Sequence, residues 1–177
     1  NRAAAKAGVR HRVFSLSLGD WLDNQVPKQW REDMAEVIEE TPNLDWLLLT
    51  KRIEMFDKMA PWPRDGLPPN VWLGVTAEDQ DHYDRRWRVL QGIPATVRFI
   101  SYEPALGALS LGTIPHPDWV ICGGESGKGY REMDLLWARF LRDQCQHWDV
   151  PFFFKQTAGK KPIPDDLLVR QFPEPRP

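Results

Sequence analysis

Six short apolar runs recur along the chain, and each is nearly continuous in hydrophobicity rather than cleanly alternating. They lie at 12–18, 45–50, 70–76, 96–101, 118–124 and 150–156. Runs of this kind are typical of strands that are buried on both faces of a parallel sheet. The pattern therefore predicts six buried, parallel strands.

Helical patterns separate these runs. We expect helices over 27–41, 79–91 and 133–148, each with one apolar stripe that packs on the sheet. The first stripe comprises Trp30, Met34, Val37 and Ile38, the second Tyr83, Trp87 and Leu90, and the third Met133, Trp137, Phe140, Leu141, Cys145 and Trp148. Arg86 and its charged neighbours in the second helix are expected to face water. Alternating strands and helices indicate βα units.

Two stretches break this alternation. The link 104–117 is short and rich in Gly and Pro, so we expect no good helix there. The end of the chain, 157–177, is rich in proline and predicts an irregular tail on the surface. The remainder fits a single domain over 1–177.

Polar or small residues follow strand after strand. The set comprises Gly19 with Asp20, Thr50 with Lys51, Thr76 with Glu78, Ser101 with Glu103, the GGES of 123–126, and Lys155 with Gln156. In a barrel these positions gather on one rim, where barrel enzymes build their sites. We therefore favour an α/β fold, a partial (βα) TIM-like barrel with about six parallel strands, although a doubly wound sheet fits the alternation too.

The length is short for a complete barrel, which typically needs ~250 residues. The chain has 177 residues and opens with the Ala-rich, helix-like NRAAAKAGVRHR. We expect the first one or two βα units of the barrel to be missing.

Charge and composition limit the classes of partner that the chain is expected to bind. The chain carries 23 Lys plus Arg against 25 Asp plus Glu, so it has no generally basic surface and nucleic acid is not indicated. No apolar run approaches the ~20 residues of a membrane span, and no signal peptide opens the sequence. We expect a cytoplasmic protein that binds a small-molecule or nucleotide-like ligand and no membrane.

The cysteines and histidines do not predict a metal site. Cys122 and Cys145 are the only cysteines, they form no C-x-x-C motif, and both are expected to be buried thiols. The four histidines are scattered, without the spacing of metal ligands. We assign no metal to this chain.

The carboxylates and amines of the expected rim suggest acid–base chemistry. Glu103 stands beside a proline and could accept a proton or bind a hydroxyl, with Lys51, Arg98 or Lys155 as its partner. Three adjacent phenylalanines would partly desolvate Lys155. The predicted catalytic residues are Glu103, Lys155, Lys51 and Asp20. A structural ion pair, or a lysine that points to solvent at the barrel edge, is the alternative.

A second group is predicted to bind a cofactor or ligand. GGESG offers backbone N–H groups to a phosphate or carboxylate, and its alternative is a tight loop in which glycines adopt positive φ. The predicted set is Gly123, Gly124, Glu125, Ser126, Thr50, Thr76, Glu78 and Gln156. Thr76 and Asp79 also have nearly the spacing of a helix-capping box. Trp21, Trp62 and Trp72 are expected to pack in the core rather than stack on a ligand ring.

Several blocks in order carry a family resemblance. VFSLSLGDWLDNQVP, LDWLLLTKR, PNVWLGVTAEDQ, VRFISYEPALG, DWVICGGESG and LRDQCQHWDVPFFFKQ resemble the bacteriophage gene-product thirty-seven/sixty-eight family of phages and prophages. Longer members of that family look like radical S-adenosylmethionine barrels with an N-terminal cysteine cluster. The resemblance implies S-adenosylmethionine and a [4Fe–4S] cluster only if a preceding segment carries those cysteines, because Ser15 stands where many relatives have Cys.

Three functional hypotheses follow. The first is a barrel enzyme with a rim site for an anionic or nucleotide-like ligand, of the radical type if the cluster segment exists. The second is a cluster-free enzyme that uses Lys51, Glu103 and Lys155 in acid–base or phosphate chemistry. The third is a non-catalytic phage accessory protein, in which a partner or a second copy covers the open barrel edge.

Overall fold

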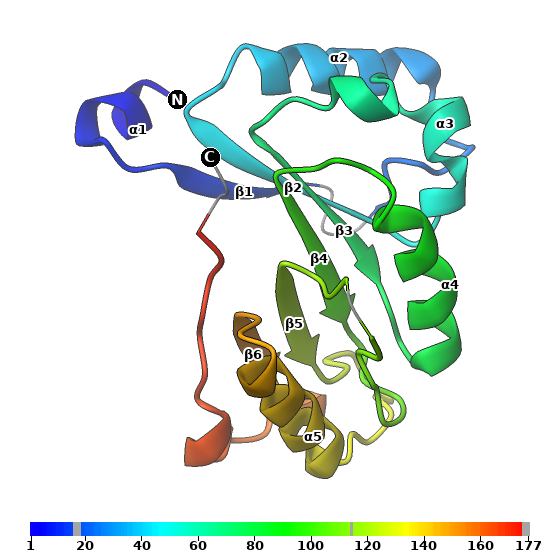
Figure 1. Ribbon diagram of the computed structural model, residues 1–177, viewed down its shortest axis with the longest axis vertical. Helices are drawn as coiled ribbons and strands as arrows, with labels where there is room; N and C mark the ends of the chain where they lie inside the picture. Colours follow the sequence, from blue (N-terminus) through cyan, green and yellow to red (C-terminus); the bar gives the residue numbers. More distant parts are fainter. Residues whose placement is uncertain (16–18, 114, 175–177) are drawn as a thin grey trace.

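Six parallel strands form one curved sheet in the computed structural model, which describes residues 1–15, 19–113 and 115–174 (Figure 1). The strands are β1 (His11–Ser15), β2 (Leu44–Thr50), β3 (Val71–Thr76), β4 (Val97–Tyr102), β5 (Trp119–Gly123) and β6 (Phe152–Gln156). The prediction of six parallel strands is confirmed. Expectations for 16–18, 114 and 175–177 lie outside the described residues.

The strands lie side by side in chain order, each paired with the next in parallel register. A doubly wound sheet reverses its strand order at a switch point. Because the described strands show no such reversal, the doubly wound alternative is wrong. The sheet curls into a half-barrel whose concave side faces left in Figure 1.

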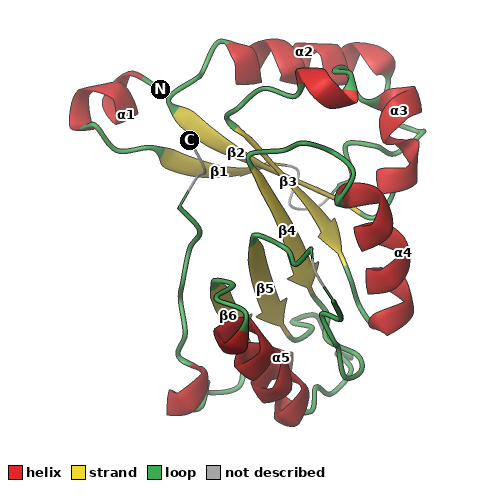
Figure 2. Ribbon diagram, in the orientation of Figure 1, coloured by secondary structure: helices red, strands yellow, loops and turns green. Residues whose placement is uncertain are grey.

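Helices other than the N-terminal one cover the convex side of the half-barrel (Figure 2). The α-helices are α1 (Arg2–Ala7), α2 (Lys28–Glu39), α3 (Phe56–Met59), α4 (Gln80–Leu90) and α5 (Leu135–His147). Short 3₁₀ turns are η1 (Ile53–Met55), η2 (Arg64–Gly66), η3 (Ala158–Lys160) and η4 (Asp165–Leu167). The described part of the link 104–117 contains no helix, as the sequence predicted.

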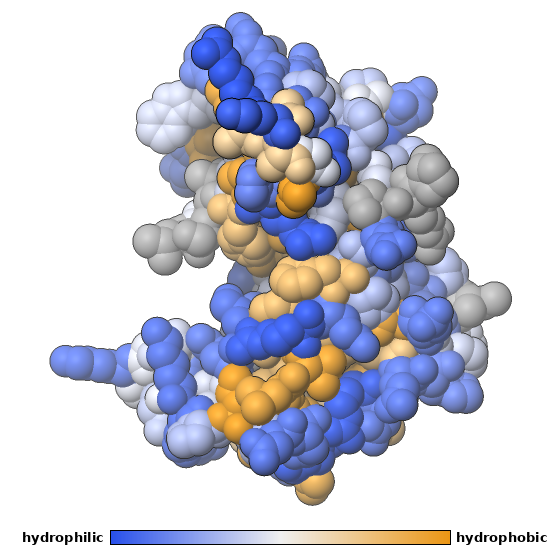
Figure 3. Space-filling view, turned by 90° about the vertical axis from the view of Figure 1, so that its left-hand side faces the viewer, coloured by the Kyte–Doolittle hydropathy of each residue, from blue (hydrophilic) through white to orange (hydrophobic). Residues whose placement is uncertain are grey.

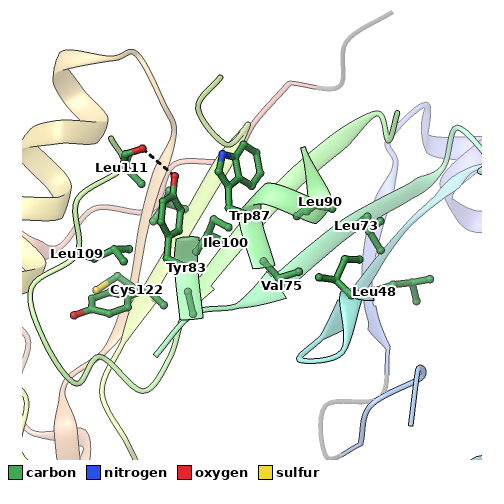
Figure 4. Close-up of a cluster of buried hydrophobic side chains, with 14 of the residues drawn as sticks. Leu48, Leu73, Val75, Tyr83, Trp87, Leu90, Ile100, Leu109, Leu111 and Cys122 are labelled. Carbon is green, nitrogen blue, oxygen red and sulfur yellow. Dashed lines mark hydrogen bonds between the residues drawn. The ribbon is translucent and has the colours of Figure 1, made fainter. Parts of the chain in front are cut away.

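Two hydrophobic cores lie on opposite faces of the sheet, because side chains alternate along each strand. The larger core fills the space between the convex face and the helices (Figure 4). The smaller core lies on the concave face and comprises Leu47, Trp72, Val97, Phe99, Trp119 and Ile121. Gly74 belongs to this second face, where a Cβ atom would overlap the ring of Phe99. Both faces of the sheet are therefore apolar, which explains the continuous hydrophobic runs.

Two of the predicted helix stripes are confirmed only in part: Ile38, Leu141 and Cys145 are buried as expected, but large aromatic members of the stripes are exposed. In α2 the buried residues are Arg31, Ala35 and Ile38, whereas Trp30 is 66% exposed. Arg31 is tolerated there because its guanidinium donates to the carbonyl of Val26 at 2.7 Å. In α5, Phe140 is likewise exposed, while Ala138, Leu141 and Cys145 are buried. Small residues that permit close helix–sheet contact displaced the large aromatic residues outward.

The stripe of α4 is confirmed, with one correction. Tyr83, Trp87 and Leu90 are buried, but so is Arg86, which was expected to face water. The helix begins after Asp79, whose carboxylate accepts from the His82 N–H at 2.9 Å and so serves as the N-cap. The predicted capping role of Thr76 is wrong, because Thr76 is the last residue of β3.

The tail is more ordered than its composition predicted. After η4 it runs antiparallel to the outer edge of β6, where Phe154 N–H donates to Val169 O at 2.9 Å and Gln171 N–H donates to Phe152 O at 3.0 Å. It then continues along the concave side of the half-barrel toward β1 (Figure 1). No helix in the described part of the chain has the length and apolar character needed to cross a membrane.

Candidate functional site

A cavity of about 940 Å³ opens on the concave side, at the carboxyl ends of the strands. Its lining contains ten of the twelve residues that the sequence predicted: Asp20, Thr50, Lys51, Thr76, Glu103, Gly124, Glu125, Ser126, Lys155 and Gln156. Gly123 and Glu78 are not part of the lining. Side chains from both ends of the chain meet here because the curved sheet brings all its carboxyl ends to one rim.

Asp20 is held by four donors. Its carboxylate accepts from Leu22 N–H at 3.0 Å, from the Thr50 hydroxyl at 2.7 Å, from Lys51 N–H at 2.8 Å and from the Arg52 guanidinium at 3.2 Å. Every lone-pair direction of the carboxylate is thus engaged. These contacts fasten the loop after β1 to the end of β2 and favour a structural role for Asp20, while its catalytic role stays a prediction.

Lys51 is tied to Glu78 in a similar way. The Lys51 ammonium lies 2.5 Å from Glu78 Oε1, and the buried Arg86 guanidinium lies 2.7 Å from Glu78 Oε2. Partial burial raises the pKa of Glu78, but the two cations together lower it below its ordinary value. Glu78 is therefore an ionised bridge between β2 and α4. We call Asp20, Thr50, Lys51, Arg52, Glu78 and Arg86 the β1–β3 network.

Glu103 and Lys155 form a looser pair on the other half of the rim. Lys155 Nζ lies 3.2 Å from Glu103 Oε2, and the Ser101 hydroxyl donates to the same oxygen at 3.1 Å. The Glu103 side chain is 17% exposed, whereas that of Lys155 is 52% exposed. Of the three phenylalanines expected to desolvate Lys155, Phe153 shares its face of the sheet, whereas Phe152 and Phe154 point to the convex core on the opposite face.

Of the three partners predicted for Glu103, the structure selects Lys155. Lys51 is engaged by Glu78, and Arg98 pairs with Asp118 at the opposite end of the sheet. The loop that carries Glu103 is fixed by Ala105 N–H, which donates to Gly123 O at 3.0 Å. The carboxylate is thereby held at the cavity wall, and no donor among the described residues forms a hydrogen bond with its Oε1.

Gly123 and Gly124 are needed for close packing. A Cβ on Gly123 would lie 2.5 Å from Glu103 Oε1, and a Cβ on Gly124 would overlap the backbone of Ala158. Neither glycine is among those with positive φ, so the predicted conformational reason is wrong. Gly123 makes room for the Glu103 carboxylate, and Gly124 makes room for η3.

The rest of the GGES segment is only partly free. Glu125 is bound on both oxygens by Arg131, whose side-chain and backbone donors lower the pKa of Glu125 to about 2. Gln156 donates to Gly124 O at 2.9 Å. The side-chain hydroxyls of Ser126 and Thr76 line the cavity and have no hydrogen-bond partner among the described residues. These two hydroxyls remain available to a ligand, whereas Glu125 does not.

Aromatic and aliphatic residues form the inner wall of the cavity, which sequence reasoning missed. They are Phe14, Leu47, Leu49, Trp119, Ile121, Phe153 and Phe172, and the polar residue Asp23 was missed as well. Ser101, which the sequence placed on the rim, and Arg52, which follows Lys51, also line the cavity. Counting back in steps of two from Ser101 and Lys155 would have placed Phe99 and Phe153 on the same face. Trp21, Trp62 and Trp72 are buried in the cores, as expected.

Comparison with known proteins assigns a family but no activity. Residues 2–165 match the model of a family described as a protein of unknown function (DUF5131). The chain belongs to this family. Neither a curated protein nor a solved structure matches the chain significantly. The description of the family names neither phages nor radical chemistry, so both expectations from the resemblance stay predictions.

The cysteines of this family member do not fit an iron–sulfur cluster. A [4Fe–4S] cluster is held by three or four thiolates, and the chain has only Cys122 and Cys145. Both lie in the convex core, away from the cavity, and burial raises the pKa of each thiol, that of Cys145 to about 12. The described residues contain no group of three or more metal-ligating side chains. The residues present therefore carry no step through such a cluster.

Proposed function

We propose that this protein is an enzyme with a TIM-like (βα) barrel architecture that binds a nucleotide-like small molecule at the carboxyl end of its half-barrel sheet. Glu103 and Lys155 perform acid–base and binding roles there. The observation that carries this proposal is their meeting at 3.2 Å on the wall of a 940 Å³ cavity, although 52 residues separate them in the chain. Cavities of roughly 300–1,000 Å³ are typical of small-molecule sites.

The roles of the two residues follow from their exposure. Lys155 extends its ammonium into solvent at the cavity and offers a point charge to a phosphate or carboxylate of the ligand. Glu103 is largely shielded and oriented by Ser101 and Gly123, so it accepts or returns a proton at a ligand hydroxyl. When the acidic group of the ligand binds the Lys155 ammonium, the Glu103 carboxylate loses its ion-pair partner and can exchange a proton with the ligand hydroxyl.

The balance of charges in the cavity limits the charge of the ligand that can bind there. Four carboxylates (Asp20, Asp23, Glu103 and Glu125) and three cations (Lys51, Arg52 and Lys155) line it. Arg52 is held by Asp20 and Asp23, and Lys51 by Glu78. Lys155 is thus the cation with the weakest attachment. A ligand that combines one acidic group with hydroxyl donors suits this arrangement better than a polyanion.

Binding of AMP tests the proposal, because AMP carries a phosphate and sugar hydroxyls. Isothermal titration calorimetry would compare the intact protein with its Lys155→Met and Glu103→Gln variants. We expect Lys155→Met to weaken AMP binding by about tenfold, which is the usual effect of removing a charge-assisted hydrogen bond of ~1.5 kcal/mol. Glu103→Gln removes the proton acceptor while it keeps the shape.

A matched control separates a local effect from a general loss of positive charge. Lys28 pairs with Glu32 on the surface of α2 at 2.9 Å and does not line the cavity. Lys28→Met should therefore bind AMP as the unmodified protein does. Equal affinity of Lys155→Met and the unmodified protein for AMP would remove Lys155 from the site and the proposal with it.

A further inference from the structure

The tail brings an aromatic side chain onto the concave face of the sheet. Two backbone hydrogen bonds fix the tail to the edge of β6, and Trp119 Nε1–H donates to Gln171 O at 3.0 Å. The next residue, Phe172, then lies 5.4 Å from the ring of Trp119 and 5.2 Å from that of Phe153, measured between ring centroids. Phe172 is thus held at a defined place by strands β5 and β6.

Phe172 also contacts β1, the strand at the opposite edge of the sheet. The Arg12 guanidinium of β1 lies 4.3 Å from the centroid of the Phe172 ring. A cation over an aromatic face at this distance is attractive. The same guanidinium lies 5.2 Å from the centroid of the Trp72 ring, so the ring of Phe172 is the nearer of its two aromatic partners. The tail therefore links the last strand of the half-barrel to the first, along the side that Figure 3 shows.

This arrangement makes Phe172 part of the cavity. Phe172 lines it together with Phe14, Trp119 and Phe153, and both Phe14 and Phe172 are 43% exposed. Exposed aromatic surface in a concave site is typical of ligand contact. Phe153 and Lys155 stand two residues apart on the same face of β6, a separation of about 6.6 Å along the strand. The aromatic wall and the charged rim can therefore contact one small molecule together.

We propose that Phe172 determines specificity in this cavity by stacking against a planar heteroaromatic ring, such as a nucleobase, whose attached sugar and phosphate reach the Glu103–Lys155 pair. The proposal rests on the function proposed above and extends it to the apolar end of the ligand. Ring stacking on aromatic side chains contributes about 1–3 kcal/mol per base and tolerates different bases. A tail residue would thus select ring-bearing ligands over sugar phosphates.

Three probes separate the two ends of the site: AMP, adenosine and ribose 5-phosphate, each titrated by calorimetry into the full chain. Phe172→Ala should weaken AMP and adenosine binding by about tenfold, the lower part of the stacking range, and leave ribose 5-phosphate binding unchanged. Lys155→Met should weaken AMP and ribose 5-phosphate and leave adenosine unchanged. The two variants therefore report on different parts of the ligand.

Two further variants control for damage to the tail. Phe172→Leu keeps the apolar contact but removes the aromatic ring, so it should retain the fold and bind adenosine with intermediate affinity. Phe140 on α5 is 49% exposed and does not line the cavity, so Phe140→Ala removes an equally exposed ring elsewhere. Its affinity for all three probes should equal that of the unmodified protein.

The outcomes distinguish this inference from the proposed function. Unchanged adenosine binding in Phe172→Ala overturns the stacking role, and so does an equal loss of ribose 5-phosphate, which would indicate a general collapse of the tail. If Phe172→Ala loses adenosine while Lys155→Met has no effect, the aromatic site stands and the function proposed for the Glu103–Lys155 pair falls. Failure of all three probes to bind the unmodified protein overturns both.

Discussion

Two charged groups face the same cavity from opposite halves of the sheet, and they differ in how fully their polar atoms are satisfied. In the β1–β3 network, Asp20 has four donors and Glu78 has a cation on each oxygen. In the Glu103–Lys155 pair, a single contact of 3.2 Å joins two side chains, one of which is half exposed. Both groups contain residues that the sequence predicted to be functional because they follow strand ends.

The difference indicates that the two halves of the cavity rim have different roles, one in stability and one in ligand binding. A carboxylate whose lone pairs are all occupied stabilises the fold and has no capacity left for a ligand. A loosely paired carboxylate and amine contribute little to stability, because exposed ion pairs are worth roughly 0–1 kcal/mol. They can exchange partners at little cost. We therefore expect substitutions in the network to reduce stability and substitutions in the pair to reduce ligand binding.

The largest expected effect belongs to Asp20. Asp20→Ala removes the acceptor for the Thr50 hydroxyl, the Lys51 N–H and the Arg52 guanidinium, so the free energy of unfolding should fall by about 3 kcal/mol. Urea denaturation followed by far-ultraviolet circular dichroism measures this change. Glu103→Ala, which removes the same charge from the other half of the rim, should cost less than about 1 kcal/mol. Equal losses in the two variants would abolish the distinction between the halves.

Arg86 should produce the next largest effect. Its guanidinium is buried and donates to Thr76 O and to Glu78, each at 2.7 Å. Arg86→Met keeps the aliphatic length but leaves Glu78 with Lys51 as its one cation, so unfolding should become easier by about 2 kcal/mol. The neighbouring Arg85 is exposed, and Arg85→Met should change stability by less than about 0.5 kcal/mol. A stable Arg86→Met variant would show that the network contributes little to the fold.

Gly123 tests the geometry of the pair itself. In Gly123→Ala the new Cβ would lie 2.5 Å from Glu103 Oε1, so the carboxylate must move away from its present position. We expect a loss of about 1–2 kcal/mol in stability, as for other overpacked sites, together with weaker AMP binding by calorimetry. The double variant Gly123→Ala, Glu103→Gln should lose no further affinity for AMP, because both changes act on one side chain. Additive losses in affinity would mean that Gly123 acts by some other route.

These contrasts also show what the sequence could predict. Continuous apolar runs identified all six strands, and the polar residues that end them identified most of the cavity rim, because both signals are local. The role of Asp20 could not be read in this way, since it depends on donors 30 to 32 residues away in the chain. The burial of Arg86 was missed for the same reason. The sequence of a helix does not show whether a carboxylate lies within hydrogen-bond distance of one of its arginines in the folded protein.

The aromatic wall of the cavity could not be predicted from the sequence for a different reason. Alternation along a strand does assign Phe153 to the face of Lys155, but both faces of this sheet are apolar, so hydrophobicity alone cannot say which face encloses a cavity. Phe172 is a harder case. It follows a proline-rich segment with no periodicity, and its position depends on the antiparallel attachment of the tail to β6. Packing of this kind is a tertiary property.

The smallest expected effect is a pH dependence carried by Glu78. Its pKa is lowered from an ordinary value of 4.5 in the folded protein, so its ionised form stabilises the fold. That contribution is complete above about pH 4.5 and is lost as the pH falls through the lower folded-state pKa. The stability difference between the unmodified protein and Glu78→Gln should therefore shrink between pH 6 and pH 3.

Other carboxylates do not obscure this measurement. Arginine side chains lower the pKa of Glu125 and of Asp166 to about 2, but both groups are unchanged in Glu78→Gln, so their titration cancels in the difference. A difference for Glu78→Gln that stays constant from pH 6 to pH 3 would contradict the role of Glu78 as an ionised bridge between Lys51 and Arg86.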